Sequence, residues 1–321
     1  MWLKLRLYLI MAVLFAIIYG LVVFAVNQMG LQGTGFFFYA VIATIMMLIQ
    51  YMIGPKMVEW SMGIHYVTEA EHPDLHRMVA ELARDAGIPK PRIGIARIPI
   101  PNAFAFGRWA KDGRVCVTEG IMSLLNEKEL RAVLAHEISH LKHRDVAIIT
   151  MISVIPMICW YFAWNQLFSG GRERGNGVLI GIVALVIYFI TNLLILYVSR
   201  IREYYADEGA VKLGSSPHHL ASALYKLVYG SARVSKESLK PVEGMKAFFA
   251  NDPSRAGSDI RELSQIDLDG SGTIDMNELM ALRTRPIKVK TGDKLLEMFS
   301  THPNMLKRIQ RLSSLQGISA Y

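Results

Sequence analysis

A glutamate and two histidines stand close together in the segment His136-Glu137-Ile138-Ser139-His140. On an α-helix, residues i and i+4 share a face, so both imidazoles can bind one metal ion. Zinc is the usual metal for such ligands, and it lowers the pKa of a coordinated water toward about 7. Glu137 can take a proton from that water without binding the metal. The pattern therefore predicts hydrolysis at a zinc site, with Glu137 as the general base.

A catalytic zinc ion needs a third protein ligand and one open position. Glu203 and Asp207 are also separated by four residues, so they share one face of a predicted helix. We assign Glu203 to the metal, and Asp207 to the N–H of a ligand histidine, where it would fix the tautomer. An ordinary solvated helix face has the same spacing, so the spacing alone leaves Glu203 open.

Four long apolar segments predict that the chain is a membrane protein. Only 19% of its residues are charged, against about 25% in a typical soluble domain. Each segment is long enough to cross a hydrocarbon core of about 30 Å as a helix. We therefore expect a mainly α membrane protein with four transmembrane helices, at residues 7–26, 36–53, 146–168 and 178–198.

The lysines and arginines predict the orientation in the membrane. The loop at 27–35 has none, and the loop at 169–177 has only Arg172 and Arg174. By the positive-inside rule, both termini and the large polar segments face the cytoplasm of a multi-pass protein in the cell inner membrane. Two cysteines without a CxxC pair fit a reducing compartment. The net charge of +8 comes without a basic stripe, so no nucleic-acid partner is expected.

The polar parts predict a small sheet followed by helices. We expect a helix at 73–86 and short strands at 92–98, 103–106 and 115–118. Asn126 and Glu129 form a predicted capping box. The helix that they begin is expected to run through 143 and on into the third membrane span. The segment 199–321 should be mostly helical. If both spans continue as straight helices, the three metal ligands lie at one height above the membrane.

Several motifs together resemble the HtpX family of membrane zinc proteases. They are HEISH at 136–140 followed by Arg144-Asp145, EYYAD at 203–207, Asn102-Ala103-Phe104-Ala105, and Ser300-Thr301-His302-Pro303 leading to Arg308-Ile309. The resemblance implies a cytoplasmic α+β metalloprotease domain of gluzincin type with a small β-sheet. It also implies a zinc endopeptidase at the cytoplasmic membrane face, acting in quality control on membrane proteins or unfolded polypeptides, and on cytosolic proteins as a further substrate class. Glu203 is the third zinc ligand that it implies.

The same resemblance implies roles for three further residues. Asn102 and Ala103 would lie on an edge strand that binds the substrate backbone, although an asparagine near prolines is more often a turn residue. His302 would steady the oxyanion of the tetrahedral intermediate. His143 stands where an asparagine is expected, and we interpret it as a surface residue.

Residues 267–278 match the twelve-residue calcium loop of an EF-hand, with glycine at the sixth position. The loop lies in a stretch at about 254–295 that resembles an insertion into the family pattern. Its alternative is a metal-free turn rich in aspartate and glycine. A lone loop predicts weak affinity, nearer the 10⁻⁴–10⁻³ M class. The predicted calcium donors are Asp267, Asp269, Ser271, the Thr273 carbonyl, Asp275 and Glu278.

Four segments follow from these predictions: two membrane helices at 1–54, the first half of the protease domain at 55–145, a membrane hairpin at 146–198, and the second half at 199–321. Two other functions remain open. One is a prenyl protease of the CAAX type, which would be expected to have more than four spans. The other is a calcium-binding membrane scaffold without protease activity.

Overall fold

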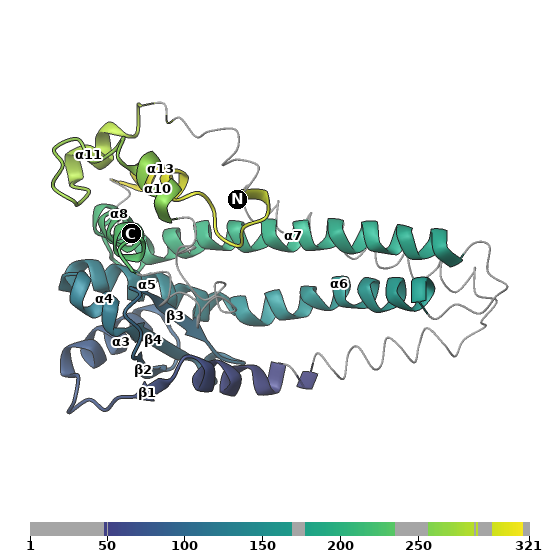
Figure 1. Cartoon of the computed structure of the whole chain (residues 1–321). Helices are drawn as coiled ribbons and strands as arrows, with labels where there is room; N and C mark the ends of the chain where they lie inside the picture. The colour runs from purple at the N-terminus through teal and green to yellow at the C-terminus, as the bar shows by residue number, and fades with distance from the viewer. Residues whose placement is uncertain are drawn as a thin grey trace. The chain divides into compact units, whose positions relative to one another are not determined.

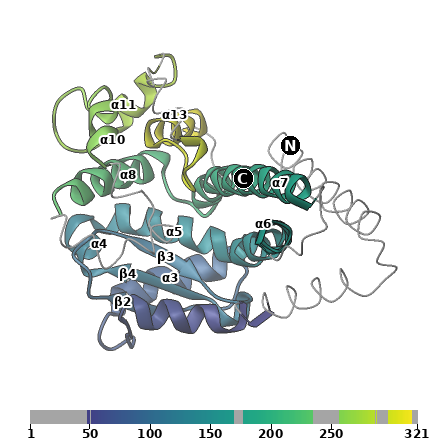
Figure 2. The same cartoon turned by 45° about the vertical axis from the view of Figure 1, so that its right-hand side comes forward.

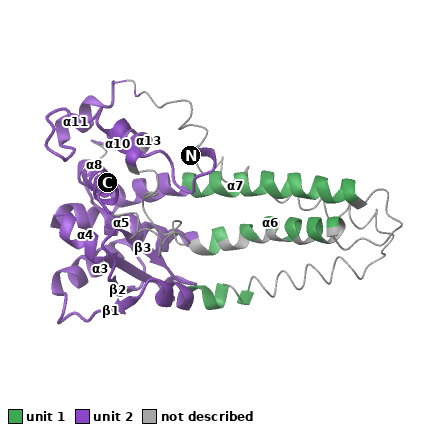
Figure 3. Cartoon of the chain, in the orientation of Figure 1, with its two compact units in different colours: residues 1–54, 147–201 green, residues 55–146, 202–321 purple. Residues whose placement is uncertain are grey.

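The structure is a computed structural model, and it describes residues 48–49, 51–168, 177–234, 256–285, 287 and 297–316. The chain divides into two compact units, each assembled from two separate segments (Figure 3). One unit comprises residues 1–54 and 147–201, and the other comprises 55–146 and 202–321. All candidate site residues belong to the second unit, so the metal centre and the calcium loop can be described within one body.

The first unit contains most of two long helices, α6 (Asp145–Phe168) and α7 (Gly177–Lys212). Among the described residues, one helix is long and apolar enough to cross a membrane, at Val178–Lys212. The third predicted span, 146–168, is helical throughout as part of α6. The first two predicted spans lie almost entirely outside the described residues. The topology of four spans therefore stays a prediction.

The second unit contains a mixed sheet of four short strands in the order β1-β2-β4-β3. The strands β2 and β4 are parallel, and the two outer pairs are antiparallel. Prolines at 99 and 101 separate β2 from β3, which explains why β2 ends earlier than the predicted residue 98. β1 was not predicted from the sequence. The strands are β1 (Ile64–Tyr66), β2 (Arg92–Ala96), β3 (Ala103–Phe106) and β4 (Arg114–Thr118).

Side chains alternate across this sheet and face two different cores. Phe104 and Phe106 of β3 pack in a small cluster with Cys116 of β4. Ala103 and Ala105 point the other way, into the main core that includes the helices. Their small size lets helix α5 (Glu127–His143) pack closely against β3. The helices α3 (Pro73–Ala86) and α4 (Glu119–Leu124) complete the first half of this unit.

The second half of this unit is helical in its described parts, as predicted. In Figures 1 and 2, α5 lies between the sheet and α8, with the remaining C-terminal helices beyond α8. Buried side chains from α5 and from these helices belong to one continuous hydrophobic core. The C-terminal helices are α8 (Pro217–Ala232), α10 (Ala256–Leu263), α11 (Met276–Ala281) and α13 (Met305–Leu315).

The prediction of one continuous helix from 126 into the third membrane span is wrong. Helix α5 ends at His143, because Arg144 adopts the left-handed conformation with φ 55°. The Arg144 N–H bonds back to the carbonyls of His140 and Leu141, and α6 begins at Asp145. By contrast, α7 continues without a break through Glu203 and Asp207 to Lys212. The break matters for the site because it turns Asp145 back toward α5.

Candidate metal centre

The capping box predicted for α5 is confirmed. Asn126 Oδ1 accepts the Glu129 N–H at 3.0 Å, and Glu129 Oε2 accepts the Asn126 N–H at 3.0 Å. The buried Glu129 carboxylate also accepts hydrogen bonds from Ser222 Oγ at 2.7 Å and from Lys226 Nζ at 2.9 Å. One glutamate therefore starts the helix and attaches it to α8. The sequence pattern indicated only the first of these roles.

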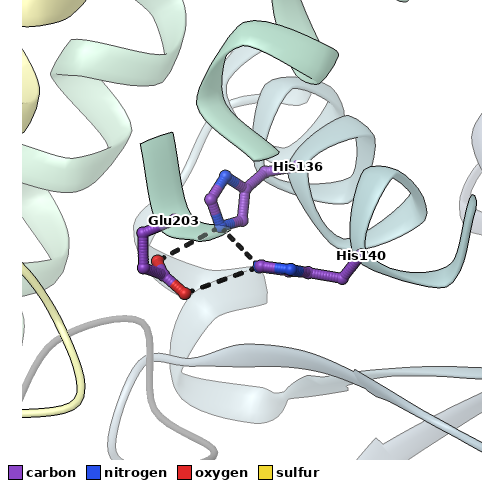
Figure 4. Close-up of side chains that lie close together, drawn as sticks. All are labelled: His136, His140 and Glu203. Carbon is purple, nitrogen blue, oxygen red and sulfur yellow. Dashed lines mark hydrogen bonds and ion pairs between the residues drawn. The ribbon is translucent and has the colours of Figure 1, made fainter. Parts of the chain in front are cut away.

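His136, His140 and Glu203 meet at one point, with both histidines on α5 and the glutamate on α7 (Figure 4). The two Nε2 atoms are 3.1 Å apart, and the Glu203 oxygens lie 3.5 Å from His136 Nε2 and 3.6 Å from His140 Nε2. A tetrahedral ion with bonds of about 2.0–2.1 Å would separate its donor atoms by roughly 3.3–3.4 Å. The spacing of the three donors therefore fits a tetrahedral metal ion.

Each histidine has a carboxylate behind it. His136 Nδ1 lies 3.0 Å from Asp207 Oδ1, and His140 Nδ1 lies 2.6 Å from Asp145 Oδ2. A proton on Nδ1 directs the lone pair of each ring to Nε2, the atom that faces the other ligands. Arg202 in turn pairs with Asp145. The sequence predicted Asp207 in this position but gave no role to Asp145, whose contact depends on the break at Arg144.

Arg308 of α13 is fully buried beside the ligands. Its Nε and NH2 donate to the two Asp207 oxygens at 3.0 and 2.7 Å, and its NH1 lies 3.0 Å from Glu203 Oε2. A buried guanidinium is stable only with such bidentate, charged partners. It fixes both acidic residues of α7 in place. The sequence motif contained Arg308, but nothing in its spacing indicated that it reaches α7.

The environment keeps His140 neutral. Burial, with a smaller contribution from the nearby His136, lowers the pKa of His140 to about 4. A neutral imidazole is the form that binds a metal ion. Burial also raises the pKa of Glu137 above its usual value, with the neighbouring histidines opposing the shift. A carboxylate with a raised pKa is a stronger base, which suits a group that must accept a proton.

Glu137 and His302 flank the three ligand residues. The Glu137 carboxylate accepts a hydrogen bond from the backbone N–H of Ala105, so it lies beside strand β3. His302 Nδ1 lies 3.5 Å from Glu203 Oε1. Among the described residues, neither ring nitrogen of His302 has a hydrogen-bond partner, although both atoms are buried. The structure thus brings the predicted base and the predicted oxyanion residue to the same place. His143 is exposed, as interpreted from the sequence.

Of the predicted substrate residues, Ala103 begins β3, one of the two edge strands of the sheet, and Asn102 directly precedes it. Both are buried, with exposed fractions of 0% and 1%. The Asn102 N–H donates to Thr118 Oγ1 at 2.9 Å, and its carbonyl accepts the Thr118 N–H at 2.9 Å. Asn102 lies directly before β3 and outside the strand, and its role in substrate binding stays a prediction.

Three of the six predicted calcium donors converge. Ligand atoms of Asp267, Asp269 and Glu278 lie within 4.8 Å of one another. Asp275 instead caps α11, where it accepts the Glu278 N–H at 2.8 Å. The Thr273 carbonyl faces Ser271 Oγ at 3.4 Å. Gly272, at the sixth position, has φ 78°, which glycine adopts without strain.

Comparison with known proteins gives a family match and several relatives. Residues 69–316 match the family described as Peptidase family M48. A protease HtpX homolog of Methanothermobacter thermautotrophicus is 55% identical over 226 residues, which cover 70% of this chain and 86% of the relative. Protease HtpX homolog 2 of Methanosarcina acetivorans is 37% identical over 291 residues, which cover 89% and 87%.

A solved structure, that of Ste24p from S. mikatae, has a similar fold. The match has a TM-score of 0.51 and 14% sequence identity. It covers 97% of this chain and 64% of the Ste24p chain, so this chain spans somewhat less than two thirds of that protein. At this identity the likeness concerns the fold alone.

Proposed function

The chain belongs to peptidase family M48, and on this premise we propose that its metal is zinc, held by His136, His140 and Glu203. It is a membrane metalloendopeptidase of the HtpX type. The observation that carries the proposal is the convergence of two imidazole nitrogens and one carboxylate at separations of 3.1–3.6 Å. Two histidines and a glutamate are a known ligand set of catalytic zinc.

The experiment is metal analysis of the purified full chain beside Glu203→Ala. Loss of the carboxylate should remove most of the bound zinc, because two histidines alone bind it weakly. Glu208→Ala is the matched control, since Glu208 lies on the same helix and pairs at the surface with Lys212 at 2.8 Å. Full zinc content in Glu203→Ala would overturn the assignment and leave Asp207 as the next candidate.

The bound metal supplies a Lewis acid that activates water and polarises the scissile carbonyl. The residues of the chain do the remaining work. The Glu137 carboxylate accepts the proton from the attacking water and then donates it to the leaving amine. A ring N–H of His302 donates to the oxygen on which negative charge develops. Asp145 and Asp207 hold the Nδ1 protons of the two histidines.

We propose that the substrate backbone lies as an added strand along β3, whose first residue, Ala103, directly follows Asn102. The position of β3 at the edge of the sheet, with Ala105 beside Glu137, supports this placement. It would bring a peptide bond next to the general base.

The wider role is also a proposal. Residues 1–54 and 146–198 would form four membrane helices, and 55–145 with 199–321 would form one cytoplasmic catalytic domain. Membrane proteins and unfolded polypeptides in the cell inner membrane would be cleaved in quality control. The two HtpX relatives, at 55% and 37% identity, support this role over a CAAX-type prenyl protease. The likeness to Ste24p concerns the fold alone and gives no information about the substrate.

We propose calcium as a second metal, bound in the loop at 267–278. The observation in its favour is a twelve-residue match whose three main carboxylates meet within 4.8 Å. Glu278 is only 6% exposed, yet its carboxylate faces the loop. Calcium prefers such oxygen donors. Isothermal titration of the full chain tests the site, and no uptake at millimolar calcium would overturn it.

A further inference from the structure

The calcium loop and the metal centre share one hydrophobic core. Ile274 of the loop and Leu279 of α11 are buried in the same cluster as Ile309 of α13 and Leu224 of α8. The helices α10 and α11 both pack against α8 and α13. Packed interiors of this kind transmit a shift of one helix to its neighbours. A conformational change in the loop therefore shifts the helices that approach the peptidase site.

The first connection runs through α13. This helix packs against α11 on one side and carries Arg308 on the other. The Arg308 guanidinium holds Asp207 at 2.7 Å and Glu203 at 3.0 Å. His302 precedes the same helix. The position of α13 thus sets the position of a zinc ligand and of the oxyanion residue.

The second connection runs through α8. Tyr225 donates a hydrogen bond of 2.7 Å to Asp267 Oδ2, the first residue of the loop. On the same helix, Lys226, which follows Tyr225 directly, and Ser222, one turn earlier, bind Glu129, the residue that caps the helix of the zinc-binding histidines. The loop is therefore joined by polar contacts to the start of α5.

Electrostatic repulsion among its carboxylates makes the metal-free loop less stable than the loop with a bound cation. The carboxylates of Asp267, Asp269 and Glu278 converge without a basic side chain among the contacts described for them. Like charges so close together destabilise the arrangement, and a divalent cation removes that cost. Binding to the ordered loop therefore stabilises the order of α10 and α11.

We infer that calcium in the 267–278 loop and the catalytic metal bind cooperatively. Calcium orders α10 and α11 against α13 and α8, and α13 then keeps Arg308 on Asp207 and Glu203. The inference rests on the two metal sites of the proposed function. By linkage, calcium raises the affinity for zinc by the same factor that zinc raises the affinity for calcium, and couplings of this type are commonly about 5–150-fold.

The test measures the zinc affinity of the full chain in detergent by equilibrium competition with a chromophoric chelator that does not bind calcium. About 10 mM calcium exceeds the weakest expected dissociation constant roughly tenfold, and equal magnesium controls for ionic strength. Calcium should raise the zinc affinity of the wild type at least about fivefold. The effect should vanish in Glu278→Gln and persist in Glu69→Gln, whose carboxylate is exposed and lies outside the loop.

Asp269→Asn provides a second variant in case Glu278→Gln fails to fold. Asp269 is exposed, and asparagine can still accept the hydrogen bond that its Oδ1 receives from the Ser271 N–H at 2.9 Å. In Asp269→Asn, calcium should raise the zinc affinity clearly less than in the wild type. An effect of calcium on zinc affinity equal to that of the wild type in both variants would overturn the inference.

Calcium uptake, measured separately by isothermal titration, distinguishes the two ways of failing. If the zinc-loaded wild type takes up no calcium, the proposed loop site falls and the cooperativity falls with it. If the wild type takes up calcium but its zinc affinity is unchanged, the loop site stands and the cooperativity is overturned.

Discussion

At the scale of single residues, each histidine of the proposed zinc site lies against its own carboxylate. Asp207 reaches His136 from α7, and Asp145 reaches His140 from the first position of α6. The two carboxylates have different supports, because Asp207 is held by Arg308 and Asp145 by Arg202. The metal binding of each histidine can therefore be weakened separately, by removing its own carboxylate.

Asp145→Asn should lower the zinc affinity by about 10–100-fold, the usual effect of removing such a partner. Competition with a chelator of known affinity measures it. Asp85→Asn is the control, since Asp85 lies at the surface with Arg84. An unchanged affinity in Asp145→Asn would mean that Asp145 serves only the turn between α5 and α6.

Glu137→Gln should keep its zinc and lose activity by about 10²–10⁴-fold, because the amide cannot accept a proton. Proteolysis of an unfolded test protein and metal analysis of the same preparation measure the two effects. If full proteolysis remained with zinc bound, Glu137 would not be the base. If the wild type had zinc but no proteolysis, the calcium-binding scaffold would regain support.

At the scale of the elements, the sequence predicted the ends of a helix where proline or glycine at those ends determines them. Helix α3 matches its predicted bounds because Pro73 begins it and Gly87 ends it in the left-handed conformation, with φ 71°. Arg144 ends α5 in the same conformation, but arginine gives no such signal. Asp145 could not be assigned from the sequence for this reason. The burial of Asn102 was likewise hidden, because it depends on Thr118 of a neighbouring strand.

Arg144→Gly should stabilise the catalytic unit by about 1 kcal/mol, since a left-handed conformation costs a non-glycine residue roughly 1–2 kcal/mol. Thermal unfolding in detergent measures the change. Lys142→Gly, inside α5 and also exposed, should instead destabilise by about 1 kcal/mol. Equal effects of the two substitutions would contradict the assigned end of α5.

At the scale of the whole molecule, a polar cluster joins the helical segment 51–61 to β4. Arg114 Nε donates to Glu59 at 2.6 Å, and its NH1 pairs with Asp112 at 3.0 Å. Burial alone would raise the pKa of both carboxyls. The contacts of Glu59 with Tyr66 and Arg114, and those of Asp112 with Arg114 and Arg108, outweigh burial and lower both pKa values.

Lowered folded-state pKa values make the catalytic unit sensitive to acid. The stabilisation from this cluster is fully present above the ordinary pKa values of 4.5 and 3.8, and it is lost as pH falls through the lower folded values. Urea unfolding between about pH 6 and pH 3 should show this loss. Arg114→Met should flatten the pH dependence, and Arg84→Met, at an exposed pair, should leave it unchanged. A steep dependence in Arg114→Met would assign the acid sensitivity to other carboxyls.

The catalytic unit consists of residues 55–146 and 202–321, so residues 147–201 of the other unit are synthesised between its two parts. His136 and His140 leave the ribosome well before Glu203, Asp207 and Arg308. At about 5–20 residues per second, the interval between residues 140 and 308 lasts roughly 10–30 s. Throughout that interval the nascent chain has the two histidines of the proposed zinc site but lacks its carboxylate and the guanidinium beside it. On the proposed assignment, the nascent chain is therefore inert toward its neighbours on the ribosome and toward itself until Arg308 has been made.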